Sequence, residues 1–238
     1  MQWKIIQTKP TKAQEIMQKD QELLELIHEE NSPLLHFYEW ATPSITYGYF
    51  LNPQKFFSFK GIEEEGISLA RRPTGGGIIF HLWDFAFSVL IPSTHSSFSQ
   101  NTLENYAYIN EAVLGAVQDF LEIKTGAVLT SQDGELIAPG SQHFCMAKPT
   151  KYDVMVQGKK VAGAAQRKTK KGLLHQGSIS LMMPSSKIVE AVLLPDCAVL
   201  SAMNFFTFPL LKQQTDEKSL SLARIQIKEL LKQHLTKR

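Results

Sequence analysis

Apolar positions at helical spacing predict three amphipathic helices in the chain. The first covers Thr11 to Glu30, with an apolar side formed by Ile16, Leu23, Leu24 and Ile27. The second covers Asn101 to Ile123, and its inward residues are expected to be Leu103, Tyr106, Ile109, Ala112, Val113 and Val117. The third, Thr215 to Leu231, repeats the pattern near the end of the chain.

Short apolar runs between and after these helices predict strands. Four or five such runs lie between the first two helices, and the segments 152–156, 159–164 and 172–181 predict three more. Alternation in the second of these places Lys160 and Ala162 on one face. The pattern favours an α/β fold in one domain, 1–238, in which a mixed or antiparallel sheet is covered by helices on one side.

Composition and charge exclude several classes of protein. Apolar residues make up 43% of the chain and charged residues 20%, which is usual for a globular protein. A formal charge of +2 is too small to argue for nucleic acid binding, and the uncharged run 85–103 contains Pro92 and His95, so it does not predict a membrane span. The start of the chain has no signal-peptide pattern, so we expect a cytoplasmic protein.

The segment Arg71 to His81 contains three consecutive glycines, Gly75, Gly76 and Gly77. Without a Cβ, the backbone of such a turn can approach a ligand closely and offer its N–H groups. The pattern lacks the Lys-Ser/Thr that ends a phosphate-binding loop. Strand-like residues follow it, whereas a helix follows the glycines of a dinucleotide-binding motif. A purely structural turn between strands is the alternative.

Lys160 stands among small residues just after a Gln157-Gly158 turn. Small neighbours leave room for a ligand beside the ammonium group, which could stabilise negative charge that develops during acyl transfer. A solvated hairpin is the alternative, because the next turn, Arg167 to Lys171, is strongly basic. That basic turn would suit an acidic protein partner or a nucleotide phosphate.

Three motifs occur in a characteristic order: Arg71 to His81, Gly158 to Gln166, and Leu174 to Ile179. Together they resemble the lipoate-protein ligase A and octanoyltransferase family, relatives of the biotin-protein ligases. The resemblance extends from about Leu34 to about Leu181. It implies a biotin/lipoate ligase-like fold with a tunnel for an eight-carbon acyl chain.

The resemblance also implies roles for particular residues. Lys160 matches the family's catalytic lysine. His81 and His175 are expected as pocket residues, and Asp84 is expected to anchor His81 or a backbone turn. The complete set of expected substrate-binding residues is Arg72, Thr74, Gly75, Gly76, Gly77, His81, Gly163, Ala164, His175 and Gly177. No metal site is predicted.

The family contains both ATP-dependent ligases and thiol-dependent transferases, so the two cysteines matter. Cys145 is followed by Pro149, Tyr152 and Asp153 at the spacing of the loop in cysteine-dependent octanoyltransferases. A thiolate there would attack a thioester, and Lys148 and Lys160 could favour that form. Cys197 is the competing nucleophile, although a half-buried, unreactive cysteine is the commoner outcome at such a position.

The primary hypothesis is transfer of an octanoyl or lipoyl group to a lysine of apo lipoyl-domain proteins through acyl-Cys145. The resemblance implies, as acceptors, E2 subunits of 2-oxoacid dehydrogenases and the glycine cleavage H protein. A transferase would take its acyl group from a donor protein and need no cofactor. An ATP-dependent lipoate ligase, using ATP, Mg²⁺ and free lipoate or octanoate, is the alternative, although we expect no C-terminal accessory domain. A non-catalytic acyl-binding or lipoyl-domain-binding module is the third hypothesis.

Overall fold

The structure is a computed structural model that describes residues 2–134, 141, 143–195, 198–211 and 216–237. The strands are β1 (Lys4–Thr11), β2 (Leu34–Trp40), β3 (Ser44–Tyr47), β4 (Ser68–Arg71), β5 (Ile78–His81), β6 (Asp84–Pro92), β7 (Ala127–Leu129), β8 (Val154–Val156), β9 (Lys159–Lys168) and β10 (Gly172–Ser180). The α-helices are α1 (Ala13–Leu26), α2 (Phe59–Glu64), α3 (Thr102–Phe120), α4 (Ser186–Val192), α5 (Val199–Phe206) and α6 (Glu217–Thr236). Short 3₁₀ helices are η1 (Ile27–Glu29), η2 (Pro53–Lys55) and η3 (Cys145–Ala147).

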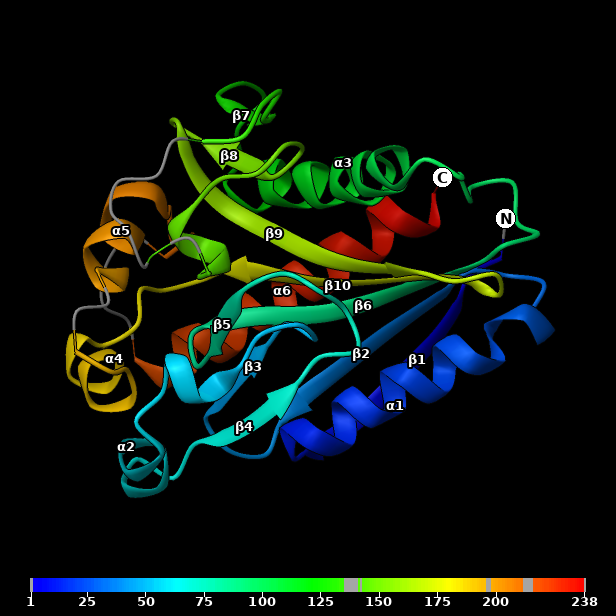
Figure 1. Cartoon of the computed structure of the whole chain (residues 1–238). Coiled ribbons are helices and arrows are strands. Elements are labelled where there is room, and N and C mark those ends of the chain that lie inside the picture. Colours follow the sequence, from blue (N-terminus) through cyan, green and yellow to red (C-terminus); the bar gives the residue numbers. More distant parts are fainter. Residues whose placement is uncertain (1, 135–140, 142, 196–197, 212–215, 238) are drawn as a thin grey trace.

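Within the described residues, seven strands form one large sheet in the order β1-β2-β6-β10-β9-β8-β7 (Figure 1). β1 and β2 run parallel, and the remaining neighbours are antiparallel. β6 and β10 lie near the centre and are buried at every position. The predicted mixed sheet is confirmed.

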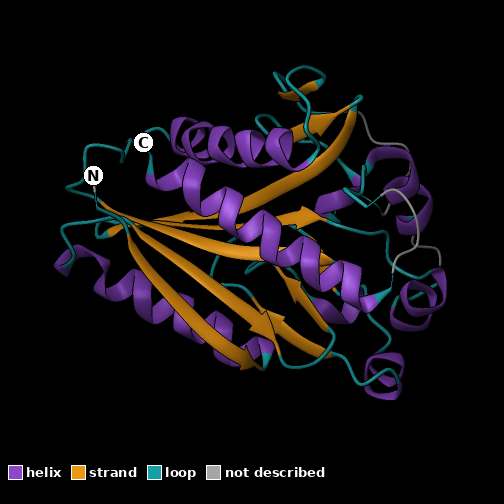
Figure 2. Cartoon of the chain, turned by 180° about the vertical axis from the view of Figure 1, so that it is seen from behind, coloured by secondary structure: helices purple, strands orange, loops and turns teal. Residues whose placement is uncertain are grey.

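Helices cover both faces of the large sheet. α1 packs on one face, where Leu24 contacts the cluster of Leu90 and Leu174. α3 and α6 pack on the other face against residues such as Val89 and Leu173, and Figure 2 shows both helices lying across the strands. The expectation of helices on one side was wrong. Side chains alternate between faces along β6 and β10, and both sets are buried, so both faces require cover.

A second, three-stranded sheet has the order β4-β3-β5 in the described part of the chain. Its apolar residues Ile45, Ile78 and Phe80 pack with Phe144 in a separate core. The glycine motif connects β4 to β5, and the Gly48 N–H donates to the Gly77 carbonyl at 3.1 Å. The small sheet therefore holds the glycine turn against the segment that carries Cys145.

The three predicted helices are confirmed as α1 with η1, α3 and α6. The β8–β9 hairpin has the predicted turn at Gln157 and Gly158, whose φ values of 52° and 76° suit a tight hairpin turn. Leu103 does not face inward: it is 46% exposed in the first turn of α3, where Asn105 takes the buried position and bonds to Ser99. None of the helices in the described ranges combines the length and apolar character needed to cross a bilayer.

Candidate active site

Cys145 begins η3 and lies half-buried beside the glycine turn. Its Sγ accepts a hydrogen bond from the backbone N–H of Gly77 at 3.2 Å. The same segment is tied to the small sheet, because the Ile78 N–H donates to the His143 carbonyl at 2.6 Å. The glycine motif and the cysteine loop, both predicted as functional, therefore meet at the sulfur.

The glycine turn reaches Cys145 because two of its residues lack side chains. A Cβ on Gly77 would lie 2.1 Å from the His143 carbonyl oxygen, a distance at which the backbone would have to shift. A Cβ on Gly76 would lie 3.2 Å from the Cβ of Ala165, which is tight, and the φ of +82° at Gly76 is one that L-residues rarely adopt. Gly75, in contrast, faces open space. The close approach thus depends on Gly76 and Gly77.

Arg72 places a buried guanidinium group inside this turn. It donates to the carbonyl oxygens of Gly75 at 3.1 Å and Gly77 at 2.6 Å, and to Thr46 Oγ1 at 2.8 Å. It also lies beside the side chain of Cys145. Burial lowers the pKa of Arg72, and the neighbouring Cys145 opposes that shift. The buried guanidinium group therefore places positive charge next to the sulfur.

Lys160, at the start of β9, is buried and points toward the Cys145 segment. Its Nζ donates to the backbone carbonyl of Cys145 at 2.6 Å and to that of Lys148 at 3.3 Å. It also forms an ion pair with Asp153 Oδ2 at 2.6 Å. The structure thus joins the predicted lysine and cysteine through the cysteine's backbone. Lys159, its neighbour, is exposed.

A β-bulge explains how the strand presents Lys160. One step along β8, from Met155 to Val154, corresponds to two steps along β9, from Lys160 to Ala162. The expected alternation of Lys160 and Ala162 on one face therefore fails, and Ala162 packs in the main core. The bulge instead turns Gly163 toward the lysine: a Cβ there would lie 2.5 Å from Lys160 Cε. Gly163 leaves room for the lysine side chain.

Asp153 is the site residue that sequence reasoning missed, although its acidic character had been noted in the cysteine loop. Its Oδ2 accepts from the N–H and Oγ1 of Thr150 at 2.6 and 2.8 Å, in addition to Lys160. Its Oδ1 accepts from the Tyr106 hydroxyl at 2.7 Å, and that hydroxyl accepts from the Ala164 N–H at 2.8 Å. Burial and Asp153 raise the pKa of Tyr106 well above its usual value, so the phenol stays a donor.

Thr74 is fully buried behind the glycine turn. Its hydroxyl donates to Gln176 Oε1 at 2.7 Å, and the Gln176 amide donates to Asp20 Oδ2 at 2.6 Å. This chain of hydrogen bonds connects the turn to β10 and then to α1. In this structure Thr74 supports the turn from behind.

His81 and Asp84 form the pair that the sequence suggested. Asp84 Oδ2 lies 2.7 Å from His81 Nδ1 and accepts from Ser178 Oγ at 2.6 Å. His81 Nε2 lies 2.8 Å from Thr46 Oγ1, and the imidazole stacks on Trp40 with ring centroids 4.4 Å apart. Asp84 thus anchors His81 and links the small sheet to the large one.

His175 and Gly177 lie on β10 among packed rings. Burial lowers the pKa of His175 to about 3, so its imidazole is neutral near neutral pH. Its Nδ1 lies 2.9 Å from the side-chain amide of Gln166. A Cβ on Gly177 would lie 2.4 Å from the Phe87 ring. Both residues therefore support the packing of β10 against β6 and β9.

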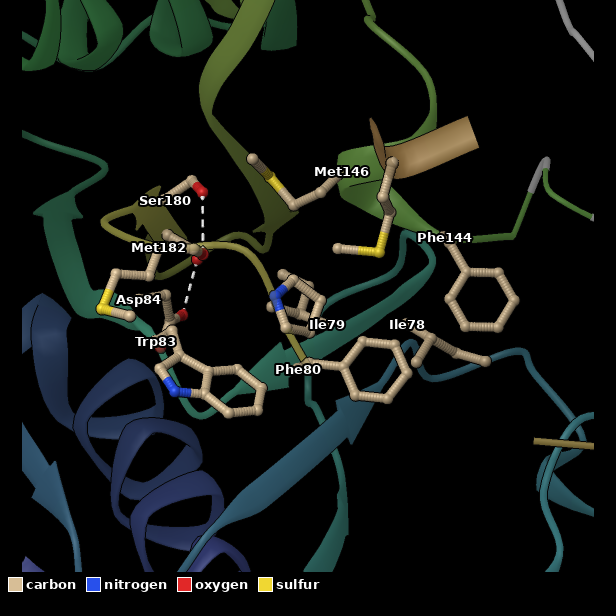
Figure 3. A pocket seen from close by; sticks show the side chains of 12 residues that line it. Ile78, Ile79, Phe80, Trp83, Asp84, Phe144, Met146, Ser180 and Met182 are labelled. Atoms are coloured by element: carbon tan, nitrogen blue, oxygen red, sulfur yellow. Dashed lines mark hydrogen bonds between the residues drawn. The ribbon is translucent and has the colours of Figure 1, made fainter. Parts of the chain in front are cut away.

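A narrow cavity is lined by residues that adjoin the glycine turn and Cys145 in the sequence. Ile78 follows Gly77, and Phe144 and Met146 flank Cys145; Figure 3 shows these side chains around the cavity, with Asp84 and Ser180 at its polar end. The free space is about 20 Å³, enough for about one water molecule. Met146, Met182 and Met203 line it, and methionine side chains adapt readily to new shapes.

Two further expectations concern cysteine and metal. Cys197 lies outside the described residues. Among the described residues, no group of three or more His, Cys, Asp or Glu side chains is arranged to hold a metal ion.

The chain matches the model of a known protein family over most of its length. Residues 12–201 match the family model of the lipoyl protein ligase A/B catalytic domain. The chain belongs to this family. The matched segment of this lipoyl protein ligase A/B catalytic domain includes the glycine turn, Cys145, Asp153 and Lys160.

Curated relatives of this catalytic domain include octanoyltransferases. The chain is 30% identical over 163 residues to octanoyltransferase LipM of Lysinibacillus sphaericus, covering 66% of the chain and 58% of that protein. It is 31% identical over 186 residues to octanoyltransferase LipM of Brevibacillus brevis, covering 76% of the chain and 67% of that protein. The matched region spans about three fifths of the length of the first relative.

Solved structures with a similar fold are lipoate-protein ligases. One is a lipoate-protein ligase A bound with ATP, with a TM-score of 0.69 and 23% identity over 98% of this chain and 86% of that chain. Another is a bipartite lipoate-protein ligase from Thermoplasma acidophilum, with a TM-score of 0.64 and 22% identity over 98% and 84% of the two chains. These likenesses confirm the predicted fold class.

Proposed function

We propose that this catalytic domain transfers an octanoyl or lipoyl group to a lysine of lipoyl-domain proteins through an acyl thioester on Cys145. The observation that carries the proposal is the surroundings of the sulfur, which accepts a hydrogen bond from the Gly77 N–H and lies beside the Arg72 guanidinium group. A cysteine in such surroundings is a nucleophile suited to thioesters. Because curated relatives are octanoyltransferases, they support a short acyl chain as the transferred group.

The reaction has two steps. In the first, the Cys145 thiolate attacks the carbonyl carbon of a donor thioester, a new C–S bond forms, and the donor thiol leaves as a thiolate. In the second, the neutral amine of the acceptor lysine attacks acyl-Cys145, an amide bond forms, and the Cys145 thiolate leaves. The amine proton passes to solvent or to the departing sulfur. Neither step consumes ATP.

The surrounding groups stabilise the charges that these steps create. Negative charge develops on the carbonyl oxygen in each tetrahedral intermediate, and buried donors stabilise such charge more strongly than water-exposed ones. Arg72 and the Gly77 N–H lie at the sulfur, and Lys160 holds the Cys145 carbonyl. The exposed backbone at Gly76 is the side from which the donor and acceptor reach the sulfur.

The acyl chain would enter the cavity beside Phe144, Met146 and Ile78. Because the free space is about 20 Å³, an eight-carbon chain requires the methionines to change rotamer. Burial of its CH₂ groups would then contribute about 0.8 kcal/mol each. This arrangement favours a short acyl chain without distinguishing octanoyl from lipoyl.

The same proposal specifies cofactors, partners and location. As a transferase, the protein needs neither ATP nor Mg²⁺, and its donor is an acyl-carrier thioester. Its acceptors are apo lipoyl domains, such as those of E2 subunits of 2-oxoacid dehydrogenases, and the glycine cleavage H protein. We place the reaction in the cytoplasm, and residues 1–238 in one catalytic domain. Arg167, which lies beside Pro73 at the rim of the turn, belongs to the basic surface offered to an acidic acceptor.

Substitution of the nucleophile tests the proposal. Cys145→Ser is expected to lose nearly all transfer, because a serine hydroxyl is a far weaker nucleophile than a thiolate near neutral pH. Wild-type protein given an octanoyl-carrier thioester without acceptor should gain the mass of one octanoyl group on the Cys145 peptide. Cys197→Ser is the matched control and should remain active.

The assay includes a second arm with octanoate or lipoate, ATP and Mg²⁺. If Cys145→Ser retains full ATP-dependent modification of an apo lipoyl domain and no adduct forms, the chain is a ligase and the transferase proposal is wrong. An adduct on Cys197 would preserve the reaction with a different nucleophile. Binding of the lipoyl domain without modification in either arm would identify a non-catalytic module.

A further inference from the structure

The ammonium group of Lys160 is held by contacts within the protein. A lysine carries three N–H donors, and three acceptors face Nζ: Asp153 Oδ2, the Cys145 carbonyl and the Lys148 carbonyl. Two of these three acceptors belong to the backbone of the cysteine segment. Lys160 therefore holds the segment that carries the nucleophile.

Asp153 in turn determines where the lysine lies. Its carboxylate is fully buried and receives four hydrogen bonds from Thr150, Tyr106 and Lys160. These donors come from the loop after η3, from α3 and from β9, so one carboxylate fixes three parts of the chain. A buried carboxylate with all these donors has few alternative positions.

The backbone before Asp153 is held in an unfavourable conformation. Tyr152 has a φ of 68°, which is rare for a bulky residue. Its carbonyl accepts from the buried side-chain amide of Asn110 at 2.8 Å. Strain of this kind persists where the surroundings require a particular geometry, and it is concentrated at functional sites. Here it directs the Asp153 side chain toward Lys160.

We infer that Asp153 is a positioning residue for the nucleophile: through Lys160 it fixes the backbone of Cys145 so that the sulfur meets Gly77 and Arg72. The inference rests on the proposed role of Cys145. Other contacts then complete the clamp, since Thr207 Oγ1 donates to the Met146 carbonyl at 2.7 Å. Asp153 needs no contact with the substrate for this role.

The kinetic test uses Asp153→Asn and the small thioester octanoyl-S-N-acetylcysteamine. The rate of Cys145 acylation at saturating thioester should fall about 100-fold, the cost of a displacement of about 1 Å at a reacting group. The thioester concentration for half-maximal rate should change little. Tyr106→Phe, which removes one donor to Asp153 and no charge, should lower the rate in the same direction by less. Lys159→Ala is the control and should acylate at the wild-type rate.

A double variant distinguishes positioning through Lys160 from a general structural effect. Asp153→Asn should add little to the loss already caused by Lys160→Ala, because both changes remove the same support. If the fold-losses of the two single variants multiply in the double variant, the inference is wrong. A folded Asp153→Asn protein with wild-type acylation would overturn it as well.

Hydrogen exchange tests the positioning without any reaction. In Asp153→Asn, backbone amides of residues 144–148 should exchange about tenfold faster, while those of β6 and β10 keep their wild-type rates. Unchanged exchange in 144–148, or a uniform increase across the sheet, would contradict the inference. If wild-type protein forms no acyl-Cys145, the proposed function fails, and hydrogen exchange still decides whether Asp153 holds this segment.

Discussion

The residues around Cys145 include three buried charged groups: Arg72, Asp153 and Lys160. Burying a charge is costly unless hydrogen bonds and an opposite charge compensate for it. Asp153 and Lys160 compensate each other, whereas the partners of Arg72 are backbone carbonyls, a hydroxyl and the Cys145 side chain. Arg72 thus retains unneutralised positive charge beside the sulfur. A buried cation at this position is suited to stabilising negative charge that develops during acyl transfer.

The glycine turn offers a matched pair of substitutions. Gly77→Ala should lower the free energy of unfolding by about 1–3 kcal/mol and should reduce acylation of Cys145, because its Cβ would displace the His143 carbonyl and the sulfur's N–H donor. Gly75→Ala should be tolerated, since its Cβ meets open space. Urea unfolding and intact-mass acylation measure both effects. Equal behaviour of the two variants would show that the close approach is unimportant.

The motifs predicted which residues of the site lie together, whereas contacts between residues far apart in the sequence determine how they are arranged. Cys145, Lys160 and Gly77 come together as the family resemblance implied. The ion pair of Lys160 with Asp153 could not be read from the sequence, because it depends on a β-bulge and a left-handed residue. Neither feature has a periodic pattern.

Among the elements, α1 is attached to the large sheet by a buried polar network as well as by apolar packing. Asp20 lies inside α1, fully buried, and bonds to His36 of β2, Ser88 of β6 and Gln176 of β10. Helical spacing predicted the helix and its apolar side, and those positions are confirmed. It could not predict that a charged residue would be buried on the same face, because that requires partners from three strands.

Asp20→Ala tests this attachment. The substitution leaves the buried groups of His36, Ser88 and Gln176 without their common acceptor, so the free energy of unfolding should fall by about 3 kcal/mol or more. Gln18→Ala, on the exposed side of α1, should change it by less than about 0.5 kcal/mol. Urea denaturation followed by circular dichroism provides both values. A change below 1 kcal/mol for Asp20→Ala, on the order of a single hydrogen bond, would mean that apolar packing alone holds α1.

Across the whole molecule, the two largest of the hydrophobic clusters formed by the described residues are joined by polar contacts at the candidate site. The large sheet and the small sheet each have a core of their own. Buried hydrogen bonds cross between them: Thr74 to Gln176, His81 to Asp84, and Lys160 to the Cys145 carbonyl. The predicted α/β class and mixed sheet are confirmed by the fold. The separation into two sheets was not predicted, because strand patterns do not reveal which strands pair.

These cross-connections predict that both sheets unfold together, as the proposal of a single domain requires. Separating the sheets would expose buried polar groups without partners, so partial unfolding should cost nearly as much as complete unfolding. Trp3 and Trp83 report on the main core, whereas Trp40 stacks on His81 of the small sheet; Cys145 adjoins the core of the small sheet through Phe144 and Met146. In a Trp40→Phe, Cys197→Ser background, tryptophan fluorescence and the reaction of Cys145 with a thiol reagent should therefore show the same urea midpoint. Full reaction of Cys145 at urea concentrations where the fluorescence is still native would show that the small sheet opens independently, and the single-domain proposal would then be wrong.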